Sequence, residues 1–198
     1  NIAHGLGVVP DVILSKNLDT GYNWDCYFKT LGYNASLQLN VTSAVRTGAW
    51  GSTTFTSTIF QTGDDYSSKN GSPYIYYCFA EKQGYSKFGS YTGNGNADGT
   101  FVYTGFKPAM VICKKSSASG TNWGIIDNKR ANSFNQISAM LNPNSNGTEG
   151  ANNNCDFVSN GFKWRTSDGN SNASATYIYM AFAENPFTTS TGVPATAR

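Results

Sequence analysis

The sequence predicts an all-β protein: an antiparallel β-sandwich, of the jelly-roll or lectin-like kind, built from two copies of one motif. Charged residues make up only 13% of the chain, while Gly (21), Tyr (12) and Phe (12) are abundant. Aromatic strands joined by small polar turns have this composition. Short apolar runs alternate with turn residues, and no stretch keeps helical periodicity over three turns. An internal repeat sets the organisation of the domain.

The repeat is most visible in an octapeptide, Tyr74–Glu81, which reappears as Tyr177–Glu184. Pro10–Lys16 matches Pro108–Lys114 at an offset of 98 residues. Three further landmarks follow in the same order, at offsets that reach 104: Asn23-Trp24 with Asn122-Trp123, Leu39-Asn40 with Leu141-Asn142, and Phe60–Asp64 with Trp164–Asp168. One ancestral half was therefore duplicated and fused.

Each copy has about 80 residues, which makes a marginal core when alone. We therefore expect one domain with internal pseudo-twofold symmetry, made of repeats at about 1–85 and 86–187 and followed by a tail, 188–198. Gly99–Phe106 leads into the proline segment of the second copy, whereas only Asn1–Val9 precedes it in the first. The chain is therefore expected to begin inside a strand of a longer polypeptide.

The strands are expected in the apolar runs. Val8–Leu14 and Ala109–Cys113 are introduced by a proline, which the first residue of a strand tolerates. The two Tyr-Ile-Tyr runs are apolar on both alternating faces, which indicates central strands covered from both sides, or at least strands packed by large aromatic residues. The intervening polar stretches are expected to be surface loops: Thr42–Thr54, Asp64–Ser72, Asn142–Asn154 and Ser167–Thr176.

Two hairpins and one short helix complete the expected elements. Phe88–Tyr91 and Thr100–Phe106 flank a polar loop suited to positive φ. Phe157-Val158 and the strand from Phe162 flank Asn160-Gly161, a dipeptide that favours a type I′ turn. The best candidate for a helix is the stretch 131–141.

Catalytic groups are scarce, and we expect no enzymatic activity. The only histidine, His4, aligns near Val102 or Tyr103 of the second copy, so any mechanism based on histidine would depend on an unmatched residue. Glu81 and Glu184 occupy matching strand ends and could form the acid and base of a glycan-cleaving enzyme. A glycosidase needs both carboxylates around one bond, whereas duplication distributes them over two places. Cross-strand ion pairs with the repeated lysines Lys16 and Lys114 are therefore favoured.

No metal and no cofactor are expected. Asn94-x-Asn96-x-Asp98-Gly99 resembles the first half of a calcium loop, but Gly105 stands where the distal glutamate belongs. A turn whose side chains bond their own backbone explains these residues more simply and is favoured. The same applies to the matched residues Asp64 and Asp168, which could be ligands and are favoured as turn formers.

The four cysteines are expected to be reduced. Cys26, Cys78 and Cys113 align with isoleucine, alanine and serine, which indicates small or apolar packing sites. A Cys26–Cys78 or Cys113–Cys155 bridge remains an alternative.

Ligand binding is assigned to residues in polar loops. Trp50 lies in a Gly/Ser-rich loop with no counterpart in the other copy, where it could stack on a sugar, contact a protein, or fold back as a lid on the core. Asn94, Asn96 and Asp98 could form hydrogen bonds with the hydroxyl groups of a ligand. Five Asn-x-Ser/Thr triplets also occur, at Asn34, Asn40, Asn70, Asn146 and Asn172.

Nucleic acid is not an expected partner, because the formal net charge is only +2. Membrane insertion is not expected either, since no apolar run approaches the roughly 20 residues of a spanning segment.

Several segments resemble a repeated domain of unknown function found in structural proteins of tailed bacteriophages, especially marine phages and cyanophages, where it occurs in tail and fibre proteins. These segments are His4–Pro10, Gly84–Gly95, Phe101–Pro108 and Tyr177–Phe187. The resemblance covers nearly the whole chain and implies a virion component with no assigned chemistry.

From the resemblance we expect a virion structural or accessory protein of the tail fibre, tail spike or capsid surface, made in the host cytoplasm. It would serve in assembly and host attachment. Its expected partners are other virion proteins, further copies of itself (as a trimer, for instance), and a glycan or protein of the host surface. A carbohydrate-binding lectin module and a glycan depolymerase are the alternatives.

Overall fold

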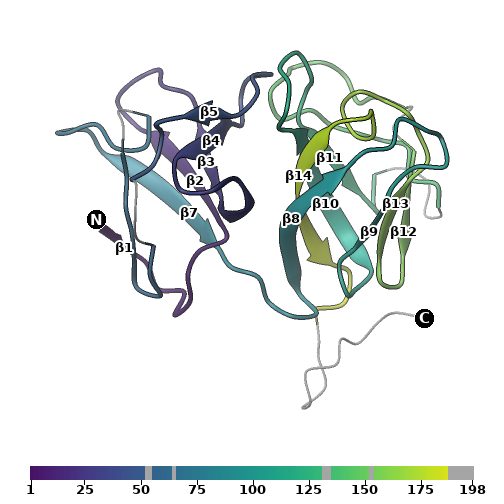
Figure 1. Ribbon diagram of the computed structural model, residues 1–198, viewed down its shortest axis with the longest axis horizontal. Helices are drawn as coiled ribbons and strands as arrows, with labels where there is room; N and C mark the ends of the chain where they lie inside the picture. Colours follow the sequence, from purple (N-terminus) through teal and green to yellow (C-terminus); the bar gives the residue numbers. More distant parts are fainter. Residues whose placement is uncertain (52–54, 64–65, 131–134, 152–153, 187–198) are drawn as a thin grey trace. The chain divides into compact units, whose positions relative to one another are not determined.

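The computed structural model describes residues 1–51, 55–63, 66–130, 135–151 and 154–186. These residues form an all-β protein in which every strand pair is antiparallel, as predicted (Figure 1). The chain divides into two compact units, 1–80 and 81–198. This boundary lies close to the predicted repeat boundary near residue 85. A single domain with pseudo-twofold symmetry stays a prediction, and the tail 188–198 lies outside the described residues.

Unit 1 contains a five-stranded sheet, in the order β5-β4-β3-β2-β7, and a two-stranded sheet, β1-β6. Its strands are β1 (Ile2–Ala3), β2 (Val12–Asn17), β3 (Asp25–Phe28), β4 (Ala35–Gln38), β5 (Arg46–Thr47), β6 (Ile59–Phe60) and β7 (Tyr74–Phe79), with a 3₁₀ turn at Lys29–Leu31. Ile13 and Tyr27 from the large sheet pack in one core with Phe60 from β6. Alternation along β2 and β3 places these side chains on the same face.

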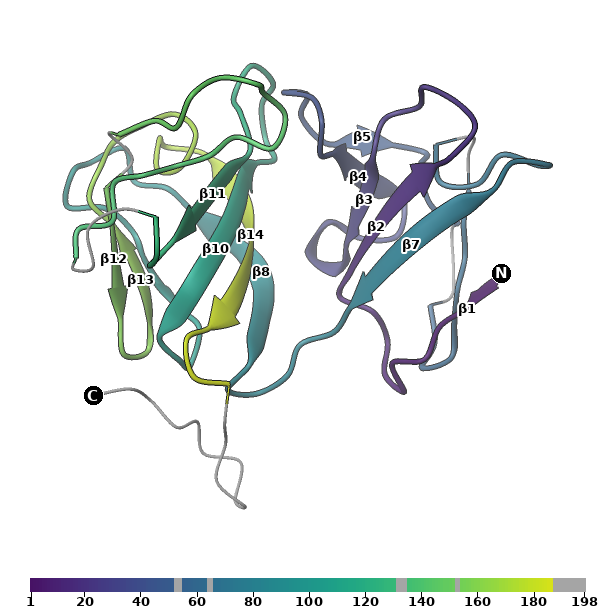
Figure 2. The same cartoon turned by 180° about the vertical axis from the view of Figure 1, so that it is seen from behind.

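Unit 2 is a β-sandwich. A four-stranded sheet, in the order β11-β10-β14-β8, packs against a three-stranded sheet, β12-β13-β9 (Figure 2). Its strands are β8 (Ser86–Thr92), β9 (Phe101–Tyr103), β10 (Pro108–Lys115), β11 (Gly124–Asp127), β12 (Cys155–Val158), β13 (Gly161–Trp164) and β14 (Thr176–Ala183). Tyr91, Tyr177 and Tyr179 from the first sheet share a buried core with Phe162 and Trp164 from the second.

The duplication recurs in the pairing register of the sheets. β2 pairs with β3 and β7 as β10 pairs with β11 and β14. Leu14 opposite Tyr77 corresponds to Ile112 opposite Met180, and every other Cα pair of β2–β7 has its counterpart in β10–β14. β1–β6 corresponds in the same way to β9–β13. The repeated side chains therefore hold equivalent places in two equivalent sheets.

One repeat landmark is aligned incorrectly by the sequence. The Asn40 side chain accepts a hydrogen bond from the Trp24 backbone N–H at 3.0 Å. In the second copy Asn144, and not Asn142, accepts the equivalent bond from Trp123 at 2.8 Å. Each asparagine satisfies a backbone donor just before the matched strand, β3 or β11, and this role identifies the true counterpart.

The Tyr-Ile-Tyr strands differ in position, which corrects one prediction. β14 is a central strand between β10 and β8, and its residues 177–181 are buried. β7 is the last strand of its sheet and its residues are only partly buried, with Tyr77 46% exposed. The repeat contains the strand, but its neighbours decide whether the strand is central.

The two predicted hairpins have different outcomes. β8 pairs with β14 and β9 pairs with β13, so the loop between β8 and β9 crosses from one sheet to the other and closes no hairpin. β12 and β13 do form the second hairpin. Its turn is Ser159-Asn160, because Val158 is opposite Gly161, and no residue other than glycine has positive φ in the described ranges. A type I′ turn at Asn160-Gly161 is therefore wrong.

Gly161 has a packing role in β13. A Cβ atom at this position would collide with the Val102 carbonyl oxygen and crowd the Phe101 ring in the neighbouring β9. The glycine thus allows close approach of two strands.

The helix predicted at 131–141 is absent from the described part of this stretch, 135–141, which contains isolated β-bridges.

All four cysteines are free thiols in the structure, three of them buried and Cys78 half-buried. Burial raises the pKa of the Cys113 thiol to about 12 and that of Cys155 well above its usual value. These two fully buried thiols are weak nucleophiles and behave as apolar packing groups.

The two units differ sharply at one matched pair of positions. Asp25 in β3 is fully buried, and its carboxylate accepts hydrogen bonds from Ser36 Oγ at 2.9 Å and Arg46 Nη2 at 3.0 Å. Its counterpart in β11 is Gly124, where a Cβ atom would lie 2.6 Å from Met140 Sδ. One unit therefore buries an ion pair where the other packs a methionine against a glycine.

Candidate ligand-binding groove

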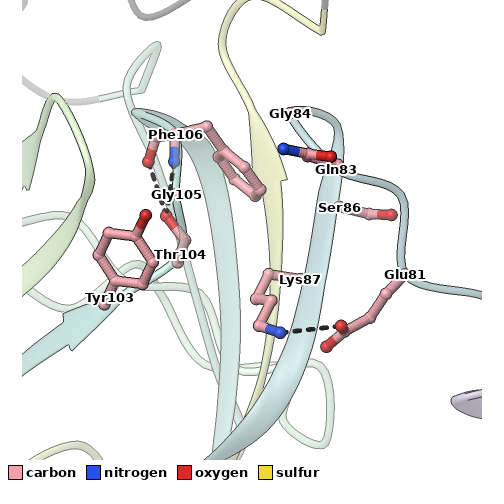
Figure 3. Close-up of a pocket in the computed structure, with 9 residues that line it drawn as sticks. All are labelled: Glu81, Gln83, Gly84, Ser86, Lys87, Tyr103, Thr104, Gly105 and Phe106. Carbon is pink, nitrogen blue, oxygen red and sulfur yellow. Dashed lines mark hydrogen bonds and ion pairs between the residues drawn. The ribbon is translucent and has the colours of Figure 1, made fainter. Parts of the chain in front are cut away.

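A cavity of about 420 Å³ opens on unit 2, where the turn before β8 lies next to the end of β9 (Figure 3). We call it the Tyr103 groove. It is lined by Glu81, Gln83, Gly84, Ser86, Lys87, Tyr103, Thr104, Gly105 and Phe106. Its volume is within the range of about 300–1,000 Å³ that is common for small-ligand sites.

Tyr103 forms one wall of the groove and is 64% exposed. Two residues further on is Gly105, whose φ of +82° favours glycine. The backbone N–H groups of Thr104 and Gly105 both donate to the Asn160 carbonyl, at 3.0 and 3.1 Å. These bonds anchor the segment to the β12–β13 turn, so the exposed ring is carried on an ordered backbone.

Charged and polar side chains form the opposite wall (Figure 3). Glu81 Oε2 lies 2.8 Å from Lys87 Nζ, and the Phe88 backbone N–H donates to the other carboxylate oxygen at 3.0 Å. Gln83 is exposed at the tip of the intervening turn, which Gly84 closes with φ of +70°. The wall therefore offers hydrogen-bond donors and acceptors with a balanced charge.

The fold does not require the two outward-facing aromatic side chains of β9, Phe101 and Tyr103. The register equates β9 with β1, which places Ala3 where unit 2 has Phe101 and Gly5 where it has Tyr103. Phe101 is 44% exposed, so neither ring is needed to fill a core. Two outward aromatic residues on one strand are therefore specific to unit 2.

A family model for a domain of unknown function, DUF7483, matches residues 1–186. This chain belongs to the DUF7483 family. The match spans both units, so the family domain contains the duplication. No curated protein and no solved structure matches the chain significantly.

Trp50 of this DUF7483 domain lies in the core of unit 1. It is 2% exposed, and its ring centroid lies 5.9 Å from that of Tyr27 and 6.2 Å from that of Phe60. Of the alternatives left by the sequence, the structure shows the lid on the core. In this position the indole has no exposed face for stacking on a sugar, which corrects the predicted ligand-binding role.

Asn94, Asn96 and Asp98 lie together in the exposed loop between β8 and β9, and they form the self-bonded turn that the sequence allowed. The Asn94 side chain accepts from the Asn96 N–H at 3.0 Å, and the Asn96 side chain accepts from the Asp98 N–H at 2.9 Å. Asp98 also pairs with Lys163 at 2.9 Å, and this bond lowers the pKa of its carboxyl group. Ligand binding by these residues stays a prediction.

Sequence reasoning missed the residue that holds this loop. Asn172 is fully buried, and its side-chain amide donates to Asn94 Oδ1 at 2.9 Å and to the carbonyls of Asn96 and Thr166 at 2.9 and 2.7 Å. Its only sequence signal was an Asn-x-Ser triplet. A buried amide with these acceptors is not an accessible acceptor for a glycan in the folded protein.

The matched glutamates are not brought together by the described residues. Glu81 pairs with Lys87, while Glu184 pairs with Lys107 at 2.8 Å and accepts from Asn128 at 2.8 Å. Only Glu81 lines the Tyr103 groove.

The predicted partners of these glutamates, Lys16 and Lys114, are incorrect. Antiparallel pairing places Lys16 opposite Ile75, at the start of β7, whereas Glu81 follows the far end of that strand. Lys16 Nζ instead donates to loop carbonyls, including that of Tyr22 at 2.6 Å.

His4 has a structural place. Its Nε2 lies 3.2 Å from the Thr56 carbonyl oxygen, and its ring stacks on that of Phe60 with the ring centroids 6.2 Å apart.

Asp168 acts as a turn former, since its carboxylate accepts a hydrogen bond from the Asn170 N–H at 2.7 Å. Its match, Asp64, lies outside the described residues. Across the described ranges, no group of three or more His, Cys, Asp or Glu side chains could hold a metal ion, and no helix is long and apolar enough to cross a bilayer.

The titration of the Lys114 ammonium group should make the free energy of unfolding depend on pH. It is fully buried, with Nζ 2.7 Å from the Lys115 carbonyl oxygen. Burial, assisted by the nearby charge of Lys115, lowers its pKa from 10.5 to about 8. Between these values the folded state binds fewer protons than the unfolded state, so the contribution of Lys114 to stability rises with pH.

Replacing Lys114 by methionine should remove this rise. Relative to Lys114→Met, the wild type should gain up to about 3 kcal/mol of unfolding free energy between pH 8 and 10.5. Denaturant unfolding at a series of pH values measures it. The buried tyrosines and cysteines titrate in both proteins, so their effects cancel in the difference. Lys114→Gln should behave like Lys114→Met, and a difference that does not change with pH would contradict the prediction.

Proposed function

We propose that this DUF7483 domain is a non-enzymatic structural module of a phage virion, at a tail fibre, tail spike or capsid surface, and that it binds a host-surface glycan in the Tyr103 groove. The virion assignment rests on the sequence resemblance, which includes Gly84–Gly95 and Phe101–Pro108. These two segments supply most of the groove lining. The glycan assignment rests on the chemistry of the groove.

The observation that carries the glycan assignment is the exposed ring of Tyr103, at a position where unit 1 has Gly5. An aromatic ring offers an apolar face with a polar hydroxyl at its end, and it loses little conformational entropy on binding. The axial C–H groups of a pyranose ring can pack on such a face. A tyrosine that the fold does not need, held beside a cavity, is the side chain that this recognition uses.

The opposite wall supplies hydrogen bonds for sugar hydroxyls. Gln83 can both donate and accept, Lys87 donates, and the Glu81 carboxylate accepts. Because Glu81 and Lys87 neutralise each other at 2.8 Å, the groove favours a neutral glycan over a strongly acidic one. The loop of Asn94, Asn96 and Asp98 is not part of the groove lining.

Binding by one groove would be weak, because the groove is partly open to solvent. Several copies on one particle would convert weak contacts into strong attachment through a high effective concentration. A homo-oligomer, such as a trimer, together with other virion proteins, would present the grooves in this way.

A glycan array with the intact chain tests the proposal. Tyr103→Ala should lower binding of the recognised glycan at least about tenfold, since loss of a stacking contact costs roughly 1.4 kcal/mol or more. Tyr103→Phe should retain most of the affinity because it keeps the ring. The matched control is Tyr77→Ala, which removes a partly exposed tyrosine from unit 1.

Two outcomes would contradict the proposal. Unchanged binding by Tyr103→Ala would remove the groove from the mechanism. Release of reducing sugar by the wild type, lost in Glu81→Gln, would replace the non-enzymatic assignment with a glycan depolymerase.

A further inference from the structure

The two matched strands β7 and β14 differ in their neighbours. In unit 2, β14 is paired on both sides, with β10 and with β8. In unit 1, β7 is paired with β2 and ends the sheet order β5-β4-β3-β2-β7. Since β2 corresponds to β10, the side of β7 that lacks a strand is the side on which β14 carries β8.

The backbone groups on this outer edge can be identified from the register. The Leu18 N–H donates to the Pro73 carbonyl at 3.0 Å, which makes them a hydrogen-bonded pair in the β2–β7 ladder. Hydrogen-bonded and non-hydrogen-bonded pairs alternate in an antiparallel ladder. Tyr76 and Cys78 are therefore at positions whose N–H and C=O groups point away from β2, and no strand of the described residues pairs with them there.

The exposure of the two strands differs accordingly. Tyr179 and Ala181, which face β8 with their backbone groups, are 4% and 0% exposed. Their counterparts Tyr76 and Cys78 are only half-buried. An edge of this kind, where the backbone groups of Tyr76 and Cys78 pair with no strand of the described residues and aromatic side chains are partly exposed, is a template for strand addition.

We propose that the outer edge of β7 is a docking site for an extended segment with the side-chain pattern of β8, which adds a sixth antiparallel strand to the large sheet of unit 1. The occupant is specified by the seated strand in unit 2. Gly89 lies opposite Tyr179, and a Cβ atom on this glycine would come within 3.1 Å of the tyrosine ring. The docked segment accordingly carries a glycine opposite Tyr76.

The neighbouring positions of the pattern follow from the same register. Lys87 is opposite Ala181 in unit 2, so the equivalent residue of the segment is opposite Cys78. Phe88 is opposite Met180, so the next residue is opposite Tyr77 and its side chain projects from the other face of the sheet. Such docking joins this domain to a further domain of the same type, which is an assembly role distinct from glycan binding.

A peptide with the sequence of residues 84–94 tests the site on the intact chain. Amide hydrogen exchange followed by NMR should slow at least tenfold at Tyr76 and Cys78 when the peptide is added, because new ladder bonds protect these N–H groups. Exchange at Tyr179 and Ala181 should not change. A peptide with Gly89→Val should protect Tyr76 and Cys78 at least tenfold less. The proposal would be overturned if the peptide gave no protection at Tyr76 and Cys78. It would also be overturned if the peptide changed exchange at Tyr179, which would show that it replaces β8 in unit 2.

A covalent version fixes the register. A peptide with Lys87→Cys, carried as an activated mixed disulfide, should form a disulfide with Cys78 and release its leaving thiol. The matched peptide with Phe88→Cys should react at least tenfold more slowly, because its thiol faces the other side. Equal yields from the two peptides would overturn the register. A dimer of the chain alone that already protects Tyr76 and Cys78 would show that a second β7 edge, and not a β8-type segment, is the occupant.

Discussion

Replacing Trp164 by alanine should lower the free energy of unfolding by about 3–5 kcal/mol, the largest effect that we expect from a single substitution. The indole is fully buried between the two sheets of unit 2, where its ring centroid lies 5.9 Å from that of Phe162 and 6.4 Å from that of Tyr91. Alanine would leave a cavity between the sheets, and the paired strands on both sides can relax into it only in part. Denaturant unfolding measures the loss, and hydrogen exchange locates it in β10 and β14.

The duplication provides controls for this experiment. Phe60 is the residue of unit 1 that corresponds to Trp164, so Trp164→Phe should cost less than half as much as Trp164→Ala. Phe60→Ala should be similarly destabilising, but it should increase exchange in β2 and β3. A loss below about 1 kcal/mol for Trp164→Ala would contradict a tightly packed interface between the sheets.

Replacing Asn172 by alanine should cost about 3 kcal/mol, because the acceptors of three part-buried hydrogen bonds lose their donor. The hydrogen bonds reach Asn94 and Asn96 in one loop and Thr166 in another, so the substitution should also release the loop between β8 and β9. NMR shifts and exchange rates at Asn96 and Asp98 measure this release. Asn146→Ala is the matched control: it removes an exposed asparagine from the same type of triplet and should change stability by less than about 0.5 kcal/mol.

Asn172→Asp separates the hydrogen bonds from the volume of the side chain. Aspartate has nearly the same shape but no donor, and its charge would face the acceptors that the amide now satisfies. It should therefore be at least as destabilising as alanine. A stability equal to that of the wild type would show that packing, and not donation by Asn172, holds the loops.

The fold was largely predictable because the two copies of the repeat can be compared with each other. A side chain that recurs at matched positions, such as the tyrosines of β7 and β14, marks a strand wherever periodicity alone is ambiguous. What could not be predicted depends on pairing between distant segments. Nothing local distinguishes β8 and β9 from a hairpin, because the polar loop between them suits both connections. The predicted ion pairs of Lys16 and Lys114 with the matched glutamates were wrong for a related reason. Matching two copies of a sequence does not show which ends of antiparallel strands lie together.

The candidate site was harder to predict than the fold. Trp50 lies in a polar loop whose composition suggests exposure, yet its ring completes the core of unit 1. The sequence predicts Tyr103 only as a strand residue between Thr100 and Phe106 and not as part of a site. The alignment contained the signal: once His4 is placed at Val102, the next position has Gly5 in one copy and Tyr103 in the other. An aromatic residue that one copy lacks was a better indicator than a tryptophan in a loop.

The contrast between Asp25 and Gly124 has a consequence for how the chain folds. Tandem repeats of similar sequence risk forming hybrid sheets, in which a strand of one copy inserts beside a strand of the other. If β3 paired with β10, the carboxylate of Asp25 would be forced against Met140 with no arginine to neutralise it, at a cost of several kcal/mol. Divergence at this single buried position thus penalises mispairing and directs each half of the chain to its own partner strands.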